Sequence, residues 1–434
     1  MSSSDGEPAT TSGGESPGQV LPPLVIATSL REDGITGVQS YVRRLRRYLG
    51  ENGVGTALVT PFSWRRPLTV PVFGVRPGLE KVSGSAGTFW YRHWHEVFLR
   101  NALKRHLATR DDCIVLAQDP LAARAALHAR RGPHQRVILV VHFRISQADE
   151  FADKKLIPHD GAVFRWIRQA ERETIPQVDG VVYVSRWARE ALVDWFPEAD
   201  EVPSTVIGCP VTPSRHEPVR EPLGDLVTLG NLDIVKNHRF LLDVLADARR
   251  RGRQYTLDIF GEGPLRKELR RQAHDLGLEG QVRFRGFQPD ARRFLSGYRA
   301  YVHAGYSESF CLAIVEAMAA GLPVVVAGIG PIPELCDDGV EGRFWPLDDP
   351  VRAAAILIEM LEDEPRRAQA AVAAVQRFHR DFDADVIVPR LLSFLSDRFA
   401  DQNVMPAEGS ADRLRAGRLR GIPVAERVQR DDAG

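Results

Sequence analysis

Short, largely apolar segments alternate with amphipathic segments along most of this chain, and the alternation occurs twice. The first series comprises residues 24–29 (LVIATS), 56–60, 113–118 (CIVLAQ), 137–142 (VILVVH) and 180–185, and the second comprises 225–230, 255–261, 281–286, 299–304 (RAYVHA) and 323–328 (PVVVAG). Strands that are apolar on both faces and separated by helices are typical of parallel sheets covered on both sides. The pattern predicts two doubly wound α/β domains.

A proline-rich stretch separates the two series and predicts a linker at 210–224. We expect an N-terminal Rossmann-like domain at 24–209, a C-terminal one at 225–380, and a last helix at 381–400 that packs back on the N-terminal domain. Residues 1–23 are rich in Ser, Gly, Pro and Thr, and 401–434 are polar with weak periodicity. These end segments are expected to be a disordered leader and a mobile tail. A ligand is expected between the domains, where the carboxyl ends of the strands meet.

Composition excludes several classes of protein. Lys plus Arg and Asp plus Glu both number 57, so the formal net charge is zero, which argues against a nucleic-acid-binding polycation. The four cysteines, at 113, 209, 311 and 336, have neither zinc-ligand spacing nor a disulfide pattern. With no signal-like or membrane-spanning apolar segment, the expected location is the cytoplasm.

The strongest local pattern is ESFCLAIVEAMAAGLPVV at 308–325. Glu308 follows a strand, residues 309–312 open the next helix with free N–H groups, and Glu316 lies inside that helix. Two carboxylates so placed can hold two polyols, such as a sugar and a ribose. The structural alternative makes Glu308 a cap and Glu316 a solvated residue, but the helix is otherwise apolar, which would bury Glu316 without a partner.

Four further segments accompany this one in a fixed order: GNLDIVKNHRFLLDV (230–244), FGEGPLRKEL (260–269), VRFRGF (282–287) and GPIPELCDDGVEGRFWP (330–346). Together they resemble the retaining glycosyltransferases of family 4. The resemblance covers roughly residues 24–400 and implies the GT-B architecture, with an N-terminal acceptor domain and a C-terminal donor domain. It also implies transfer of a sugar from a nucleotide diphosphate sugar to an acceptor hydroxyl, with no metal and no other cofactor.

The resemblance assigns roles to residues of the C-terminal half. Lys236, one of only six lysines in the chain, is expected to contact the donor diphosphate beside Gly230. Where the family has an Arg, this chain has Asn231, whose neutral hydrogen bond weakens the expected phosphate clamp. Glu308 is expected to hold the donor sugar and Glu316 the ribose. The remaining donor-binding candidates are Phe287 and Gln288 beside the base, and the amides of Phe310, Cys311 and Leu312 beside the sugar and phosphates.

Candidates in the N-terminal half are less specific. Gly37 opens a helix where the backbone could approach the diphosphate, although an ordinary turn explains it nearly as well. His142 ends a buried strand and matches a family histidine near the donor sugar, with a structural role about equally probable. Asp119 and Glu150 are weaker acceptor-side candidates.

Other patterns favour simpler interpretations. His93 and His95 point in different directions on a helix, which argues against a metal site. The basic run from Arg43 to Arg47 favours a solvated helical face, with weak contact to anionic lipid at the inner membrane face as the alternative. The alternative functions left open are a nucleotide-sugar epimerase or a phosphorylase on the same fold, or a sugar-nucleotide-binding protein without catalysis.

Overall fold

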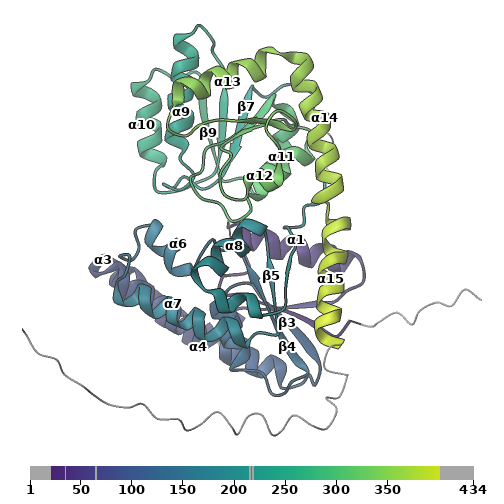
Figure 1. Ribbon diagram of the computed structural model, residues 1–434. Coiled ribbons are helices and arrows are strands. Elements are labelled where there is room, and N and C mark those ends of the chain that lie inside the picture. The colour runs from purple at the N-terminus through teal and green to yellow at the C-terminus, as the bar shows by residue number, and fades with distance from the viewer. Residues whose placement is uncertain (1–20, 35, 64–65, 215–216, 218, 401–434) are drawn as a thin grey trace, which may run out of the picture.

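The computed structural model describes residues 21–34, 36–63, 66–214, 217 and 219–400, and most of the expected leader and all of the expected tail lie outside these ranges. It contains two six-stranded sheets, one per domain, and all strand pairs within them are parallel. The strand orders are β2-β1-β3-β4-β5-β6 and β12-β11-β10-β7-β8-β9. The prediction of two doubly wound α/β domains is confirmed (Figure 1).

The N-terminal domain builds its sheet from six strands with helices on both faces. The strands are β1 (Leu24–Ala27), β2 (Thr56–Val59), β3 (Cys113–Ala117), β4 (Gln135–Val141), β5 (Gly180–Tyr183) and β6 (Ser204–Val206). The helices are α1 (Gly37–Glu51), α2 (Arg66–Gly74), α3 (Arg76–Val82), α4 (Gly84–Leu107), α5 (Pro120–Leu127), α6 (Gln147–Asp153), α7 (Ala162–Thr174) and α8 (Arg186–Trp195). Every residue of β3 and β4 is buried, as expected for central strands covered on both faces.

The C-terminal domain repeats the arrangement. Its strands are β7 (Leu226–Leu229), β8 (Leu257–Phe260), β9 (Val282–Gly286), β10 (Ala300–His303), β11 (Val324–Val326) and β12 (Gly342–Phe344). Its helices are α9 (His238–Arg250), α10 (Arg266–Asp275), α11 (Leu312–Ala319), α12 (Ile332–Leu335), α13 (Pro350–Glu362) and α14 (Glu364–Asp381), and α15 (Ala384–Ala400) follows. Because β7 and β10 are neighbours in the sheet, the loops that follow them are brought side by side.

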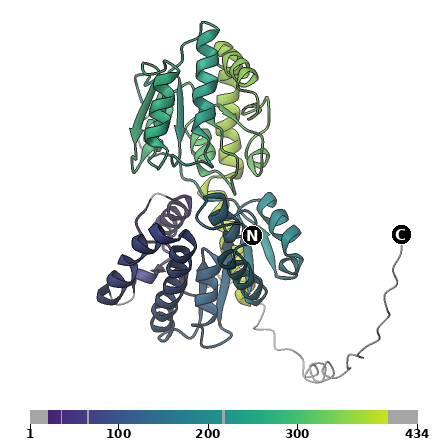
Figure 2. The same cartoon turned by 90° about the vertical axis from the view of Figure 1, so that its left-hand side faces the viewer.

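The chain crosses between the domains twice, and the two crossings are hydrogen-bonded to each other. In the expected linker, Val211 donates its N–H to the carbonyl of Phe382 (3.2 Å) and accepts from the N–H of Ala384 (3.0 Å). Beyond this point α15 lies along the N-terminal domain, as Figures 1 and 2 show. A methyl group placed on Gly180 of β5 would come within 3.1 Å of the Phe394 ring, which shows how closely α15 approaches the sheet.

Helix α4, which carries His93 and His95, starts at Gly84, before the aromatic run that begins at Phe89. Ser83 caps it by accepting from the N–H of Ala86, so the helix includes the small residues that precede the aromatic run. His95 of this helix is buried, and its Nδ1 lies 2.7 Å from the carbonyl oxygen of Tyr91. Along the described ranges, no helix is both long and apolar enough to cross a membrane.

Candidate active site

Lys236 and Glu308 meet at the carboxyl ends of two neighbouring strands. Lys236 lies in the loop between β7 and α9, and Glu308 lies in the loop between β10 and α11, residues 304–311. The Nζ atom of Lys236 is 2.5 Å from Oε1 of Glu308. The Glu308 side chain is only 9% exposed, whereas that of Lys236 is 25% exposed, so part of the Lys236 side chain remains accessible.

His303, the last residue of β10, holds the same carboxylate from the other side. Its Nε2 lies 2.8 Å from Oε1 of Glu308 and 3.8 Å from the sulfur of Cys311. The side chain of His303 is buried beneath the β10–α11 loop. One oxygen of Glu308 therefore contacts two nitrogen donors, which fixes the direction in which the carboxylate points.

The charges in this group reinforce one another. Burial opposes the ionisation of Glu308, but the nearby Lys236 and His303 outweigh it and lower its pKa to about 2. Burial likewise opposes protonation of His303, but Cys311 and Glu308 outweigh it and raise its pKa to about 9. For Lys236, burial favours the neutral amine, yet Glu308 keeps its pKa above the usual value. Glu308 is thus an anion held between two cations at neutral pH.

The loop that carries Lys236 is shaped by its own backbone contacts. Oδ1 of Asp233 accepts from the N–H groups of Val235 and Lys236, each at 3.1 Å. The N–H of Tyr306 then donates to the carbonyl of Val235 at 2.9 Å, which joins this loop to the β10–α11 loop. Gly230 and Gly261 pack closely, because a methyl group placed on Gly261 would lie 1.8 Å from the Gly230 carbonyl oxygen.

Two polar atoms beside Lys236 are buried without a hydrogen-bond partner among the described residues. They are Nδ2 of Asn237 and Nδ1 of His238, at the start of α9. Burial, followed by the charges of His303 and Lys236, lowers the pKa of His238 to about 3, so its ring is neutral. Buried polar groups are normally hydrogen-bonded, and exceptions are frequent where a ligand binds.

The start of α11 follows the expected pattern in part. Cys311 immediately precedes this helix at a φ of 73°, a conformation that favours glycine, and Leu312 is its first residue. The side chain of Phe310 is buried, and its ring approaches Gly208 and the ring of Phe382. Phe310 therefore packs into the junction of the two domains with its ring, and only its backbone is left to face a donor.

Glu316 has a partner, contrary to the expectation from its apolar helix. It forms an ion pair with Arg44 of α1, which comes from the other domain, and both side chains are largely buried. One terminal nitrogen of Arg44, Nη1, is buried with no partner among the described residues. Arg44 is thus part of the domain interface, whereas Arg43 and Arg47 of the same basic run are exposed.

The N-terminal candidates occupy separate places. His142 lies 2.9 Å from the side-chain oxygen of Gln118, and burial lowers its pKa to about 3. Asp119 caps α5 through Ala122 and accepts two hydrogen bonds from Ser29, so both of its oxygens are engaged within the domain. Glu150 lies in α6, where burial raises its pKa. Gly37 is the exposed first residue of α1, after a capping box formed by residues 36 and 39.

The remaining donor-side candidates lie on neighbouring loops. Phe287 is 44% exposed and, with Gln288, follows β9, beyond Gly286 at a φ of 73°. Asn231 lies directly after Gly230 and is half-buried. The structure therefore brings Lys236 and Glu308 together and places Gly230 beside the aliphatic part of the Lys236 side chain. Glu316 is instead paired with Arg44 of the other domain.

One group of side chains in the described part of the chain offers metal-ligand atoms close together. These atoms belong to His303, Glu308 and Cys311 and lie within 4.8 Å of one another. The Glu308 oxygen that would bind a dication already contacts the ammonium of Lys236. A metal at this position would have to displace that cation.

Sequence reasoning missed His303 and the contacts between the domains. His303 ends an otherwise apolar strand immediately before a functional loop, which is the same signal that drew attention to His142. The partners of Glu316 and of the β10–α11 loop come from the other domain, and no spacing within the chain indicates them.

Two Rossmann-like domains with charged groups at the carboxyl ends of the C-terminal strands define a GT-B protein. Two family models match consecutive parts of the chain: "Glycosyltransferase Family 4" over residues 35–215 and "Glycosyl transferases group 1" over residues 214–377. The chain belongs to the glycosyltransferases of family 4 and is a nucleotide-sugar-dependent transferase.

Individual relatives are consistent with this family, and solved structures are consistent with its fold. A phosphatidyl-myo-inositol mannosyltransferase of Mycolicibacterium smegmatis is 29% identical over 82% of this chain and 89% of the relative. A D-inositol 3-phosphate glycosyltransferase of Corynebacterium diphtheriae is 38% identical over 23% of this chain and 24% of the relative. The fold is similar to that of sucrose-phosphate synthase from Thermosynechococcus elongatus, with a TM-score of 0.68 at 17% identity over 87% of this chain and 100% of the other. Anabaena HepE in complex with UDP and glucose gives a TM-score of 0.64 at 18% identity over 86% and 99%.

Proposed function

We propose that this protein transfers a hexosyl group from a nucleotide diphosphate sugar to an acceptor hydroxyl and retains the anomeric configuration. The observation that carries the proposal is the Glu308 carboxylate, fixed by Lys236 and His303 beside the start of α11. A carboxylate held in one direction can accept hydrogen bonds from sugar hydroxyls, and the ammonium of the partly exposed Lys236 side chain can pair with the donor diphosphate.

The acceptor hydroxyl attacks the anomeric carbon on the face from which the nucleotide leaves. The new C–O bond forms as the bond between the anomeric carbon and the phosphate oxygen breaks, and the departing phosphate takes the acceptor proton. Lys236 and the free N–H groups at the start of α11 stabilise the negative charge that develops on the diphosphate. In this proposal they take the place of a divalent metal. Asn231 adds a neutral hydrogen bond, and Glu316 binds the ribose after it parts from Arg44.

The names of the relatives indicate which acceptors to test first. Two are named for phosphatidyl-myo-inositol and for D-inositol 3-phosphate. An inositol hydroxyl on a phosphorylated or lipid-linked acceptor therefore precedes polysaccharide and secondary-metabolite acceptors. For the donor, a mannosyl nucleotide is tested because the Mycolicibacterium smegmatis relative is named a mannosyltransferase. UDP-glucose is tested because the solved HepE complexes contain UDP-glucose or its parts.

The test is a transfer assay with GDP-mannose, UDP-glucose and UDP-N-acetylglucosamine against inositol, inositol 3-phosphate and phosphatidylinositol. We expect a product whose anomeric configuration by NMR equals that of the donor. In the same assay Glu308→Ala should reduce kcat/KM about 10²–10³-fold while the Kd of the free nucleoside diphosphate changes little. An inverted product contradicts retention, and equal losses in turnover and nucleotide binding contradict the sugar-binding role of Glu308. Donor binding without transfer to any acceptor favours the non-catalytic alternative, and donor conversion without acceptor favours an epimerase.

A cytoplasmic location with weak attachment to the inner membrane face is proposed on the exposed Arg43 and Arg47 of α1. These guanidinium groups can approach anionic headgroups without disturbing Arg44 in the domain interface. Sedimentation with anionic and zwitterionic vesicles tests this. Binding to anionic vesicles alone that is lost in Arg43→Gln/Arg47→Gln is expected, and equal sedimentation of that variant contradicts it.

A further inference from the structure

The first turn of α8, in the N-terminal domain, contacts the loop that carries Glu308 in the C-terminal domain. The hydroxyl of Ser185 accepts from the N–H of Ala188 at 3.1 Å and so caps the helix. The same hydroxyl donates to the carbonyl oxygen of Ser309 at 2.8 Å. A hydroxyl carries one proton and two acceptor lone pairs, so both bonds form at once.

Glu334 of α12 holds the start of α8 in place from the opposite domain. Its two carboxylate oxygens accept from the N–H groups of Arg186 (2.9 Å) and Trp187 (2.7 Å). The first N–H groups of a helix have no partner within it, and a negative charge is favourable there. Glu334 therefore fixes α8 against the C-terminal domain through groups that would otherwise face solvent.

The ring of Trp187 adds a packing contact on the same side. Gly330, at a φ of 54°, is close to both this ring and the backbone of Glu308. A methyl group placed on Gly330 would lie 3.6 Å from the Glu308 carbonyl oxygen and 3.7 Å from the Trp187 ring. The start of α8 thus contacts the backbone of Ser309 directly and approaches that of Glu308 through Gly330.

We propose that Ser185 is a positioning residue for the Glu308 carboxylate, and that Glu334 keeps Ser185 in position. Lys236 and His303 fix the side chain of Glu308 within the C-terminal domain, whereas its backbone is fixed from the N-terminal domain through Ser309. The acceptor domain thereby helps to orient the group that binds the donor sugar. The effect on turnover rests on the proposed function, whereas the ordering of the β10–α11 loop does not.

The experiment compares two substitutions that treat the two hydrogen bonds of Ser185 differently. Ser185→Asp keeps an acceptor for the cap but has no proton to donate to Ser309, and Ser185→Thr keeps both. Amide hydrogen exchange of peptides that cover residues 304–312 reports the order of the loop without any substrate. The kcat and KM for the nucleotide sugar that the wild type turns over, and the Kd of its free nucleoside diphosphate, report function.

For Ser185→Asp we expect about tenfold faster exchange in the loop and about tenfold lower kcat, with KM and nucleotide Kd changed less than about threefold. The thermal stability of Ser185→Asp should stay close to that of the wild type because the cap is kept. Ser185→Thr should keep both the exchange rate of the loop and kcat at wild-type values. Glu334→Gln, which weakens the hold on α8 without changing its shape, should shift both in the same direction by about threefold.

Wild-type exchange in Ser185→Asp overturns the proposal, and so does a Ser185→Thr variant as impaired as Ser185→Asp. If the loop loosens but kcat stays at the wild-type value, the link to Glu308 is wrong. A wild-type protein that turns over no nucleotide sugar counts against the proposed function instead, and the exchange comparison still decides whether Ser185 orders the loop.

Discussion

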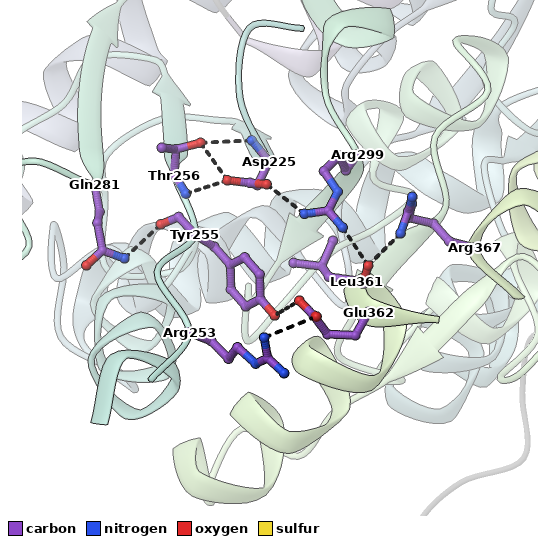
Figure 3. Close-up of polar contacts among 9 residues, drawn as sticks. All are labelled: Asp225, Arg253, Tyr255, Thr256, Gln281, Arg299, Leu361, Glu362 and Arg367. Carbon is purple, nitrogen blue, oxygen red and sulfur yellow. Dashed lines mark hydrogen bonds and ion pairs between the residues drawn. The ribbon is translucent and has the colours of Figure 1, made fainter. Parts of the chain in front are cut away.

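The two ends of the C-terminal sheet carry the same kinds of charged and polar side chains but pair them differently. At the amino ends of β7, β8 and β10, Asp225 accepts from the N–H (2.9 Å) and hydroxyl (3.0 Å) of Thr256 and from Arg299 (2.8 Å). Arg299 also donates to the carbonyl of Leu361 at the end of α13. Figure 3 shows how this network continues through Tyr255 and Glu362.

At the carboxyl ends of the same strands, the polar groups are not all used. Lys236, His303 and Glu308 contact one another, but the side chain of Lys236 stays partly exposed and polar atoms of residues 237 and 238 are buried without a partner among the described residues. None of the side chains drawn in Figure 3 carries such an atom. Because the side chains of Figure 3 leave no buried polar atom without a partner, whereas residues 237 and 238 do, we infer that the amino end stabilises the domain and the carboxyl end binds a ligand.

The largest expected effect comes from removing the cation at the carboxyl end. If the proposed function is right, Lys236→Ala should lower kcat/KM about 10³-fold, because the donor diphosphate would lose the cationic side chain that this loop offers. The fold should survive, since His303 still pairs with Glu308. Steady-state kinetics and circular dichroism measure both, with Lys267→Ala on the exposed face of α10 as a matched control. Near-normal turnover of Lys236→Ala would contradict the proposed role of Lys236 in binding the donor diphosphate.

The opposite result is expected at the amino end. Asp225→Ala removes three hydrogen bonds from a carboxyl whose pKa is lowered because Thr256 and Arg299 outweigh its burial. We expect a loss of ~2–4 kcal/mol in the free energy of unfolding, measured with urea. The kcat of the folded protein should be unchanged. A lower kcat at equal folded fraction would show that the two ends of the sheet are coupled, and would contradict the separate roles inferred for them.

The charges at the carboxyl end also stabilise the fold, in a way that depends on pH. The raised pKa of His303 gives stability that is complete below about 6.5 and lost as the pH rises through about 9. The lowered pKa of Glu308 gives stability that is complete above about 4.5 and lost as the pH falls through about 2. His303→Gln should therefore lower the free energy of unfolding by on the order of 2 kcal/mol between about pH 4.5 and pH 6.5, and by less at higher pH.

Urea denaturation of the wild type and His303→Gln across this pH range measures the difference. Tyr301→Phe on the same strand serves as a control for general damage to β10. A difference in stability that is constant from pH 5 to above 9 would contradict an ion pair between His303 and Glu308.

The sequence predicts the fold, and part of the site, for a physical reason. Alternating apolar strands and helices require parallel sheets, and parallel sheets bring the loops after β7 and β10 to one edge, so Lys236 and Glu308 could be placed together. His303, as the last residue of β10, lies at the same edge of the sheet for the same reason. The partners of Glu316 and Ser309 could not be predicted, because they depend on how one domain is oriented against the other, and neither helix periodicity nor motif spacing carries that information.

The smallest expected effect concerns the ion pair between Arg44 and Glu316, which joins the two domains at the expected ribose site. If Arg44 must leave Glu316 before the ribose binds, then Arg44→Gln makes that carboxylate available and should tighten binding of the nucleoside diphosphate about threefold. Isothermal titration measures this, with Arg47→Gln on the exposed side of α1 as the control. Weaker binding would mean that the unpaired Nη1 of Arg44 itself contacts the nucleotide, and the N-terminal domain would then contribute to donor binding directly.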